Sequence, residues 1–193
     1  MKTWALVMAA VFSSACATQS GVAKSDVKGT NAVEYYPLKV GNSWNYDVKF
    51  LGEKHTETVL IEGVADGYFV SKSSSNGAEP VKLMADAYGV RDEKRYLLRE
   101  PVESGTTWTN VVSVETVEHY KILSARAPCD TVAGHFTDCV VVESKVRAAQ
   151  GNLSNQMTFA RGVGLVRVST ELESGGKVVP QVTLELTAYQ LGK

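Results

Sequence analysis

The sequence predicts an all-β protein: a single antiparallel β domain, built as a half-barrel, a barrel or a sandwich, after a signal peptide and a flexible tether. Apolar and polar residues alternate in many short segments, and clusters of Gly, Asn and Ser separate many of them. The segments recur about every ten residues, a spacing typical of antiparallel sandwiches and barrels. After the N-terminal segment, no helical period of 3.6 residues extends over more than about two turns.

The first 15 residues are expected to be a secretory signal peptide. Met1-Lys2-Thr3 carries one positive side chain, residues 4–12 are all apolar, and small residues follow. A helix over this apolar run would rise roughly 14 Å, far less than the ~30 Å hydrocarbon core of a bilayer. The segment is therefore typical of a signal and too short for a transmembrane helix.

The end of this segment, Ser14-Ala15-Cys16, resembles the lipobox of bacterial lipoproteins. The resemblance implies that Cys16 becomes the mature N-terminus and carries acyl chains that anchor the protein to a membrane. Ser13 departs from the pattern, because an aliphatic residue usually stands there. Signal-peptidase cleavage after Ala17 is the alternative. By resemblance to enterobacterial lipoproteins, Ala17 after the cysteine implies the outer membrane.

Residues 16–33 are expected to form a flexible linker that begins with the lipidated Cys16. They are mostly small and polar, contain no aromatic residue and show no sustained period. The β domain is therefore expected to span residues 34–193, a length that can bury a sizeable core.

Composition argues against several classes of protein. The chain has 193 residues with 20 basic and 21 acidic side chains, and its formal net charge is −1. The overall composition is that of a globular protein, which excludes a fibrous chain and disorder along the whole length. Because the chain has no basic excess to neutralise phosphates, nucleic acid is not an expected partner.

The strands are expected from alternation along the chain. At residues 44–50, apolar side chains alternate with polar ones, which predicts a half-buried strand with its apolar side chains facing inward. Further strands are expected over residues 58–62, 68–73, 80–85, 88–92, 94–99, 108–117, 119–127, 139–146, 153–159, 164–171 and 177–189. The last of these shows the clearest alternation.

Two parts of the chain show a weak internal sequence similarity. The tetrapeptides that end in Trp44 and Trp108 both begin with Gly, and His55 and His119 follow the two tryptophans at the same distance. Two explanations stay open at this point: a sheet built from two duplicated halves, or chance.

Cys129 and Cys139 are expected to form a disulfide. Gly134 lies between them and permits a tight turn, so the two cysteines can face each other across a hairpin. An exported chain meets oxidising conditions, and lipidation accounts for the third cysteine, Cys16. A metal site with His135 is the alternative, but the close ligand pairs of metal sites are missing. No metal is therefore expected.

No catalytic residues and no cofactor are expected. The histidines occur outside any metalloprotease motif, and the sequence lacks a nucleophile-elbow motif. The segment Arg161-Gly162-Val163-Gly164 resembles a phosphate loop only faintly, since a third glycine and a helix pattern are missing. The chain is therefore not expected to be an enzyme.

Several aromatic side chains fall on the inward faces of the expected strands. Either they pack into a core, or they line an apolar cavity of ligand size. The candidate cavity residues are Trp44, Tyr46, Phe50, Trp108 and Phe159.

Three separated segments together resemble uncharacterised bacterial cell-envelope lipoproteins with an all-β domain. The segments are Tyr35-Tyr36-Pro37-Leu38 with Gly41-Asn42-Ser43-Trp44, then Ala133-Gly134-His135-Phe136, then Gly162-Val163-Gly164-Leu165-Val166. The resemblance implies an address in the cell envelope and a β fold. It brings no catalytic residues that can be transferred to this chain.

Two functions follow as hypotheses. The first is a non-enzymatic lipoprotein, anchored in the outer membrane on its periplasmic face or displayed outside the cell. It would act as a binding or scaffolding module for an envelope protein complex, by strand addition at a sheet edge for instance. The second is a carrier or receptor for a lipid or another apolar ligand, held in the cavity of a β half-barrel.

Overall fold

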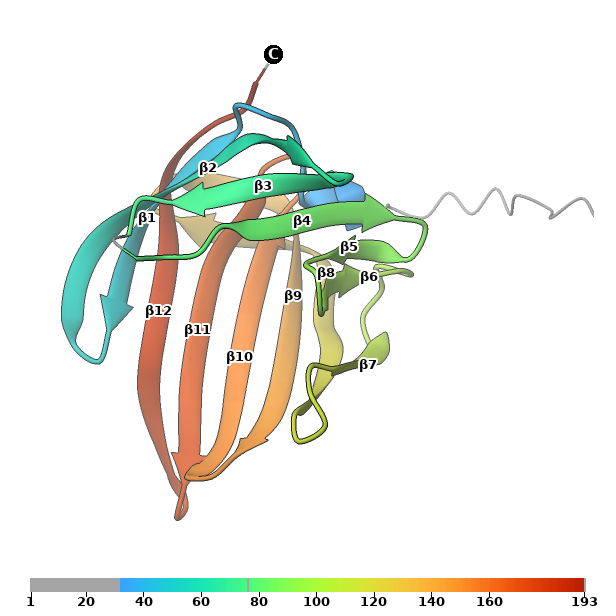
Figure 1. Ribbon diagram of the computed structural model, residues 1–193. Helices are drawn as coiled ribbons and strands as arrows, with labels where there is room; N and C mark the ends of the chain where they lie inside the picture. The colour runs from blue at the N-terminus through green and yellow to red at the C-terminus, as the bar shows by residue number, and fades with distance from the viewer. Residues whose placement is uncertain (1–31, 76, 193) are drawn as a thin grey trace, which may run out of the picture.

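The computed structural model describes residues 32–75 and 77–192. The predicted signal peptide, Cys16 and most of the predicted linker lie outside these residues. The described chain forms one short 3-10 helix and a 12-stranded sheet (Figure 1). In chain order the elements are η1 (Ala32–Tyr35), β1 (Ser43–Phe50), β2 (Glu53–Ala65), β3 (Tyr68–Ser73), β4 (Val81–Asp86), β5 (Gly89–Arg91), β6 (Tyr96–Arg99), β7 (Thr107–Val111), β8 (Val117–Thr131), β9 (Gly134–Ala148), β10 (Gly151–Ala160), β11 (Gly164–Ser174) and β12 (Lys177–Gln190).

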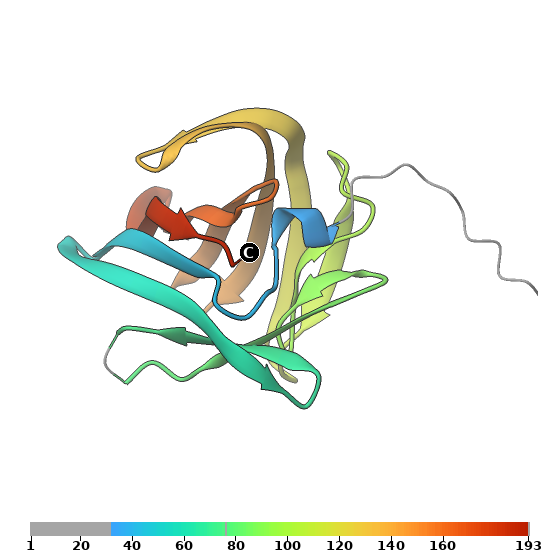
Figure 2. The ribbon, with the colours of Figure 1, turned by 90° about the horizontal axis from the view of Figure 1, so that it is seen from above.

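The sheet is a nearly closed barrel made of two consecutive meanders. Its strand order is β6-β5-β4-β3-β2-β1-β12-β11-β10-β9-β8-β7, so the first strand of the chain pairs with the last. That pair runs from Ser43 opposite Gln190 to Phe50 opposite Val182. Figure 2 shows the strands curled around a common interior. The all-β prediction is confirmed, and the architecture is a barrel and not a sandwich.

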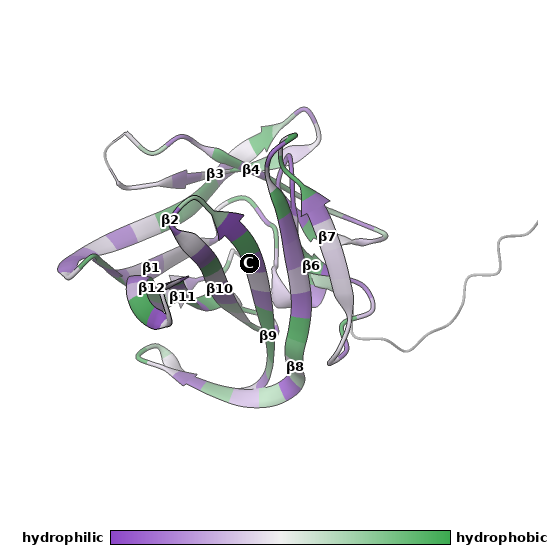
Figure 3. Ribbon diagram, turned by 90° about the horizontal axis from the view of Figure 1, so that it is seen from below, coloured by the Kyte–Doolittle hydropathy of each residue, from purple (hydrophilic) through white to green (hydrophobic). Residues whose placement is uncertain are grey.

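Each predicted stretch overlaps a strand, but several limits differ. The stretch predicted over residues 108–117 ends as a strand at Val111, and a turn separates it from β8. Strands β8 and β9 are longer than predicted, because register shifts such as that between Ile122 and Ser124 interrupt the alternation without ending the pairing. Along the first half of β8, exposed and buried positions alternate. Hydropathy does not follow this alternation, and β8 shows a hydrophilic stretch followed by a hydrophobic one (Figure 3). The helix η1 begins at Ala32, inside the segment predicted as linker.

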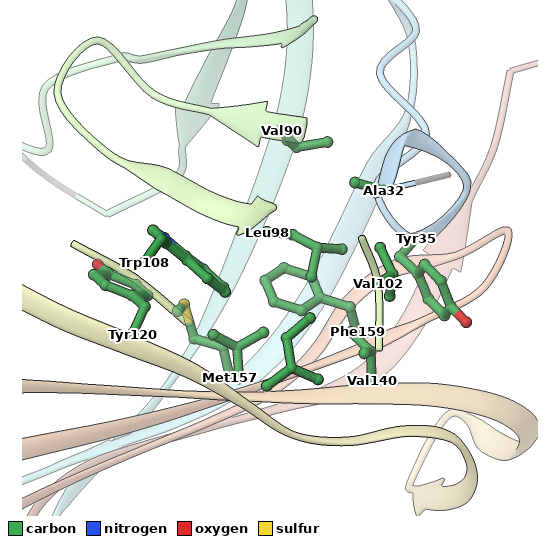
Figure 4. Packing of buried hydrophobic residues seen from close by; sticks show 12 residues of the cluster. Ala32, Tyr35, Val90, Leu98, Val102, Trp108, Tyr120, Val140, Met157 and Phe159 are labelled. Atoms are coloured by element: carbon green, nitrogen blue, oxygen red, sulfur yellow. The ribbon is translucent and has the colours of Figure 1, made fainter. Parts of the chain in front are cut away.

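Two hydrophobic clusters fill the interior. One gathers around Trp108, Tyr120 and Phe159, where the first two rings stack with their centroids 5.2 Å apart (Figure 4). The other gathers around Trp44 and Leu186. Tyr36 links them, since its ring lies 6.1 Å from that of Trp44 and 5.9 Å from that of Phe159. Burial of each such large side chain contributes about 1.5–3 kcal/mol.

The barrel closes at β6 and β7 through side chains. In the part of the chain that the structure describes, no backbone ladder joins these two strands. Instead, Trp108 Nε1 donates to the carbonyl oxygen of Tyr96 at 2.9 Å. The side chain of Asn110 also donates to that oxygen and accepts from the Tyr96 amide, both at 3.1 Å. Arg95 then binds both carboxylate oxygens of Glu118. We call these contacts the seam.

The upper end of the barrel, defined as the end that carries η1 and the C-terminus in Figure 1, is plugged. The hydroxyl of Tyr35 in η1 donates to Asp138 at 2.7 Å. The end of the β8–β9 hairpin reaches across to β12, where the Ala133 amide donates to the Leu186 carbonyl at 3.1 Å. Nearby, the rings of Phe136 and Tyr189 lie 6.3 Å apart. In Figure 2 this hairpin curves along the rim of the barrel toward β12.

The two meanders begin in the same way. Gly41 and Gly105 precede β1 and β7 with φ of 90° and 93°, values that glycine adopts without strain. The Gly41 amide donates to the Ile61 carbonyl at 2.9 Å, and the Gly105 amide donates to the Ile122 carbonyl at 2.8 Å. Both isoleucines are fully buried. The shared geometry supports the explanation that the sheet is built from two related halves.

Candidate functional site: the lower inner face

The lower halves of β9, β10, β11 and β12 extend below the short strands that cover their upper halves (Figure 1). Their inner face, which continues the wall of the core, carries a row of apolar side chains. Leu153 lies opposite both Val146 and Leu172, and Leu172 lies opposite Val179. Direct cross-strand partners point to the same side of a sheet. The row therefore crosses four strands. We call the surface formed by Val146, Leu153, Leu172, Val179, Phe50 and Val182 the lower inner face.

This row lies beyond the packed core. Val146, Leu153 and Leu172 are half-buried and belong to neither hydrophobic cluster. At the rim the side chains are more open, with 51% of Phe50 and 47% of Val179 exposed. Adjacent apolar side chains that remain open to solvent mark a surface where a ligand or a partner gains free energy by covering them.

A polar band separates this row from the core. Asn155 lies opposite Ser144 on one side and Thr170 on the other. The Thr170 hydroxyl donates to Asn155 Oδ1 at 3.0 Å. The lower inner face thus offers apolar contacts at its rim and hydrogen-bonding groups deeper in, an arrangement that suits a ligand with one apolar and one polar part.

The carboxylate of Glu118, beside the row, is neutralised by the seam. Glu118 lies opposite Val146 and is buried. Arg95 Nε contacts its two oxygens at 3.0 and 2.9 Å, and the Tyr120 hydroxyl donates to it at 2.8 Å. Burial, and then the hydrogen bond to Glu118, raise the pKa of Tyr120 well above its usual value. The carboxylate is thus fully engaged in structure.

The five predicted cavity residues do not share one surface. Trp44 and Tyr46 lie in one hydrophobic cluster, and Trp108 and Phe159 lie in the other. The Trp44 indole donates to the Val163 carbonyl at 2.7 Å, and the Tyr46 hydroxyl donates to the Leu165 carbonyl at 2.9 Å. Four of the five side chains therefore pack inside the barrel. Phe50 alone of the five lies on the lower inner face.

Sequence reasoning missed the residues that form the row. Val146, Leu153 and Leu172 lie at or just beyond the limits of predicted strands, and Val179 lies near the start of the last one. The alternation within each strand was readable, but the pairing between strands was not. The sequence does not reveal the register between the strands, and this register brings the side chains into one row.

The predicted cysteine pair is present. Cys129 and Cys139 form a disulfide with their Cα atoms 6.0 Å apart, near the turn end of the β8–β9 hairpin. His135 instead contacts Asp130 at 2.6 Å on the exposed tip of this hairpin. Within residues 32–75 and 77–192, no three His, Cys, Asp or Glu side chains gather as a metal site would require. Cys16 lies outside the described residues.

A charged hollow of about 510 Å³ lies on the outer face of β12, β1 and β2. It is open and shallow. Its polar lining comes from Asp47, Lys49, Lys54, His55, Thr56, Thr183 and Glu185. Among the described residues, no helix has the length and apolar character needed to cross a membrane.

Comparisons with known proteins add a likeness of fold. The sequence matches no protein-family model and no curated protein. A protein of Bacteroides fragilis, described as exported and with a YmcC-like fold, superposes with a TM-score of 0.47 and 10% identity over 81% of this chain and 98% of its own. A protein of Parabacteroides distasonis, described as a lipoprotein, superposes with a TM-score of 0.40 and 12% identity over 83% of this chain and 100% of its own. At these values, neither likeness carries an argument about function.

Proposed function

We propose that this chain is a non-enzymatic binding protein of the bacterial envelope that holds an apolar ligand, such as the acyl chain of a lipid, on its lower inner face. One observation carries the proposal: the row Val146, Leu153, Leu172 and Val179, which continues the inner wall of the barrel beyond the packed core.

The dimensions of the row suit an extended apolar chain. Neighbouring strands lie about 4.8 Å apart, so a row across four strands spans roughly 14 Å. Phe50 and Val182 extend the apolar surface toward β1. Above the row, Asn155 and Thr170 supply groups for a polar head. A ligand that covered these half-open side chains would gain about 25 cal/mol for each Å² of apolar surface removed from water.

The scaffolding hypothesis has less support, because the sheet offers few clean edges for strand addition. The terminal strands β6 and β7 have only four and five residues, and the seam occupies both backbone groups of Tyr96. The outer edge of β8 is interrupted by register shifts, and Arg126 within it has φ of 60°. Bulges of this kind blunt an edge against pairing.

The proposed location follows from the sequence. Acyl chains on Cys16 would anchor the mature protein in the outer membrane, on its periplasmic face, with the linker between membrane and domain. An anchored domain with an apolar inner face would lie near the lipids that it binds. Cleavage after Ala17 would instead release a soluble protein with the same lower inner face.

Neighbouring residues of β12 provide a matched test. Val179 faces inward and Val178 faces outward, with 47% and 58% of their side chains exposed. A fluorescent fatty acid is titrated into the chain and into the Val179→Gln and Val178→Gln variants. We expect Val179→Gln to weaken binding about tenfold, because a polar side chain interrupts the apolar row, while Val178→Gln leaves binding unchanged.

Native mass spectrometry of protein extracted gently from its own membranes gives an independent readout. A mass of one lipid beyond the acylated chain supports the proposal. Equal effects of the two valine variants, or a protein held without a bound small molecule in a stable larger assembly, would overturn it in favour of the scaffold.

A further inference from the structure

The β1–β2 hairpin ends in an apolar tip at the lower end of the barrel. Its two-residue turn is Leu51-Gly52, between the paired residues Phe50 and Glu53. The side chains of Phe50 and Leu51 are 51% and 62% exposed. Leu51 and Gly52 have φ of 47° and 97°, and positive φ at both central residues is the mark of a type I′ turn.

Leu51 is unfavourable in this position. The left-handed region disfavours residues with a bulky side chain, and type I′ turns favour Asn, Asp or Gly. Two other hairpin turns with positive φ at both central residues are Asp66-Gly67 and Gly175-Gly176, which follow this preference. Among the described residues, Leu51 is the one apolar side chain with positive φ.

Folding gives no reason for a leucine at the tip. The side chain is exposed, so it contributes little to the core, and its backbone is strained. Strain of this kind persists where a function requires it. The tip is also held in place, since the Leu51 amide donates to the Gln181 carbonyl of β12 at 3.0 Å. The hairpin thus presents Leu51 at the lower end of the barrel on a fixed support, next to Phe50, which lies at the rim of the lower inner face.

Two lysines flank the apolar tip. Lys49 and Lys54 lie directly opposite each other, an arrangement of like charges that destabilises a hairpin. Neither forms an ion pair with any residue in 32–75 or 77–192. Glu53 is the one acidic residue between them, which leaves the segment 49–54 with a net positive charge.

We propose that this hairpin docks on the surface of a phospholipid bilayer. Leu51 inserts at the boundary between headgroups and acyl chains, and Lys49 and Lys54 contact the headgroup phosphates. Apolar side chains flanked by cations are the pattern that binds this boundary. The proposal goes beyond ligand binding, because docking depends on Leu51 and the two lysines, which are not part of the lower inner face.

Vesicle co-sedimentation tests the docking. The chain that begins at Ala17 is used, since it lacks the anchor cysteine but keeps all described residues. Vesicles consist either of phosphatidylethanolamine with phosphatidylglycerol or of phosphatidylcholine alone. We expect Leu51→Asn to lower partitioning about tenfold on both. Lys49→Gln and Lys54→Gln are each expected to lower it about fivefold on the anionic vesicles.

Matched controls separate docking from general surface effects. Val64→Asn removes an apolar side chain that is 58% exposed near the next hairpin turn, and Lys94→Gln removes a lysine of the β5–β6 turn. Both variants are expected to partition like the unmodified chain. Because Asn-Gly is a favoured type I′ sequence, Leu51→Asn should fold at least as well as the unmodified chain, which circular dichroism checks.

The outcomes are decisive in either direction. Loss of partitioning in a folded Leu51→Asn chain, with both controls unaffected, supports docking. Absence of partitioning by the unmodified chain overturns the proposal, as does full partitioning by Leu51→Asn. A variant that still binds vesicles but loses a protein partner overturns it in favour of a protein contact. Val179→Gln is expected to keep vesicle binding, so failure of the ligand proposal is distinguishable from failure of this one.

Discussion

Asn110 forms hydrogen bonds with both backbone groups of Tyr96. Its Nδ2 donates to the carbonyl oxygen, and its Oδ1 accepts a hydrogen bond from the amide, each at 3.1 Å. One side chain thereby takes the place of the backbone hydrogen bonds that β6 and β7 do not form with each other. Trp108 reinforces it with a hydrogen bond from Nε1 to the same carbonyl. The barrel is therefore closed by side chains at the place where its two terminal strands meet.

Asn110→Ala is expected to lower the free energy of unfolding by about 2 kcal/mol. The variant loses two hydrogen bonds at a buried position and leaves the Tyr96 amide without its partner. Urea denaturation followed by circular dichroism measures the loss. Asn152→Ala, at an exposed position of β10, is the control and should change little. Equal effects of the two variants would show that the seam does not stabilise the barrel.

Removal of the disulfide is expected to destabilise the domain by about 3 kcal/mol. Cys129 and Cys139 are separated by 10 residues in sequence, and a closed loop of this size restricts the unfolded chain by about that free energy. Denaturation of the Cys129→Ala, Cys139→Ala double variant tests it. A reductant should destabilise the unmodified chain and leave the double variant unchanged. A reductant that has no effect on the unmodified chain contradicts the expectation.

Stability is expected to fall as the pH rises from 10 to 12. Burial raises the pKa of Tyr36 from 10.0 to about 12. The unfolded chain therefore releases this proton at lower pH than the folded chain, so the stabilisation is complete below pH 10 and is lost as the pH rises through 12. The loss from this group is roughly 2 kcal/mol at pH 12.

The Tyr36→Phe variant isolates this contribution. Denaturation at several alkaline pH values should show a shallower fall in stability for the variant. Part of the fall should persist, because burial also raises the pKa of Tyr46 and Tyr120. Identical pH profiles for the two chains would assign the alkaline loss to the other tyrosines.

Leu51→Asn is expected to raise the free energy of unfolding by about 1 kcal/mol. Asparagine tolerates the left-handed conformation that Leu51 adopts, with φ of 47°. Thermal unfolding measures the gain. The reciprocal change, Asp66→Leu in the matched turn Asp66-Gly67, should lower stability by a similar amount. A destabilised Leu51→Asn chain would mean that the leucine makes a structural contribution at the tip.

The positions of the strands were largely readable from the sequence. Alternation in residues 44–50 and 177–189 predicted β1 and β12 nearly to their ends, because apolar side chains on one face of each strand point toward the barrel interior. Alternation failed at β7 and β8, where the chain turns between Val111 and Val117, and along β8, where shifts of register change the side that successive residues face. The disulfide was predictable because turn chemistry and compartment both restrict the choice of partner.

The candidate site was much less predictable. Four of the five aromatic residues expected to line a cavity pack inside the barrel instead, and three of them, Trp44, Tyr46 and Trp108, find carbonyl acceptors there. The lower inner face is built from aliphatic residues of four different strands, and no single strand reveals it. Its residues become neighbours only through the order and register of the sheet.

The sequence by itself determined the class of the fold, the position of most strands and the pairing of Cys129 with Cys139, since each depends on local pattern or on a short stretch of chain. Only the tertiary structure decided that the sheet closes through Asn110 and Tyr96, and that Leu153 and Leu172 form one open row. It also showed that Leu51 occupies a strained turn. These features depend on contacts between distant segments and on backbone conformation, and the alternation of side chains specifies neither.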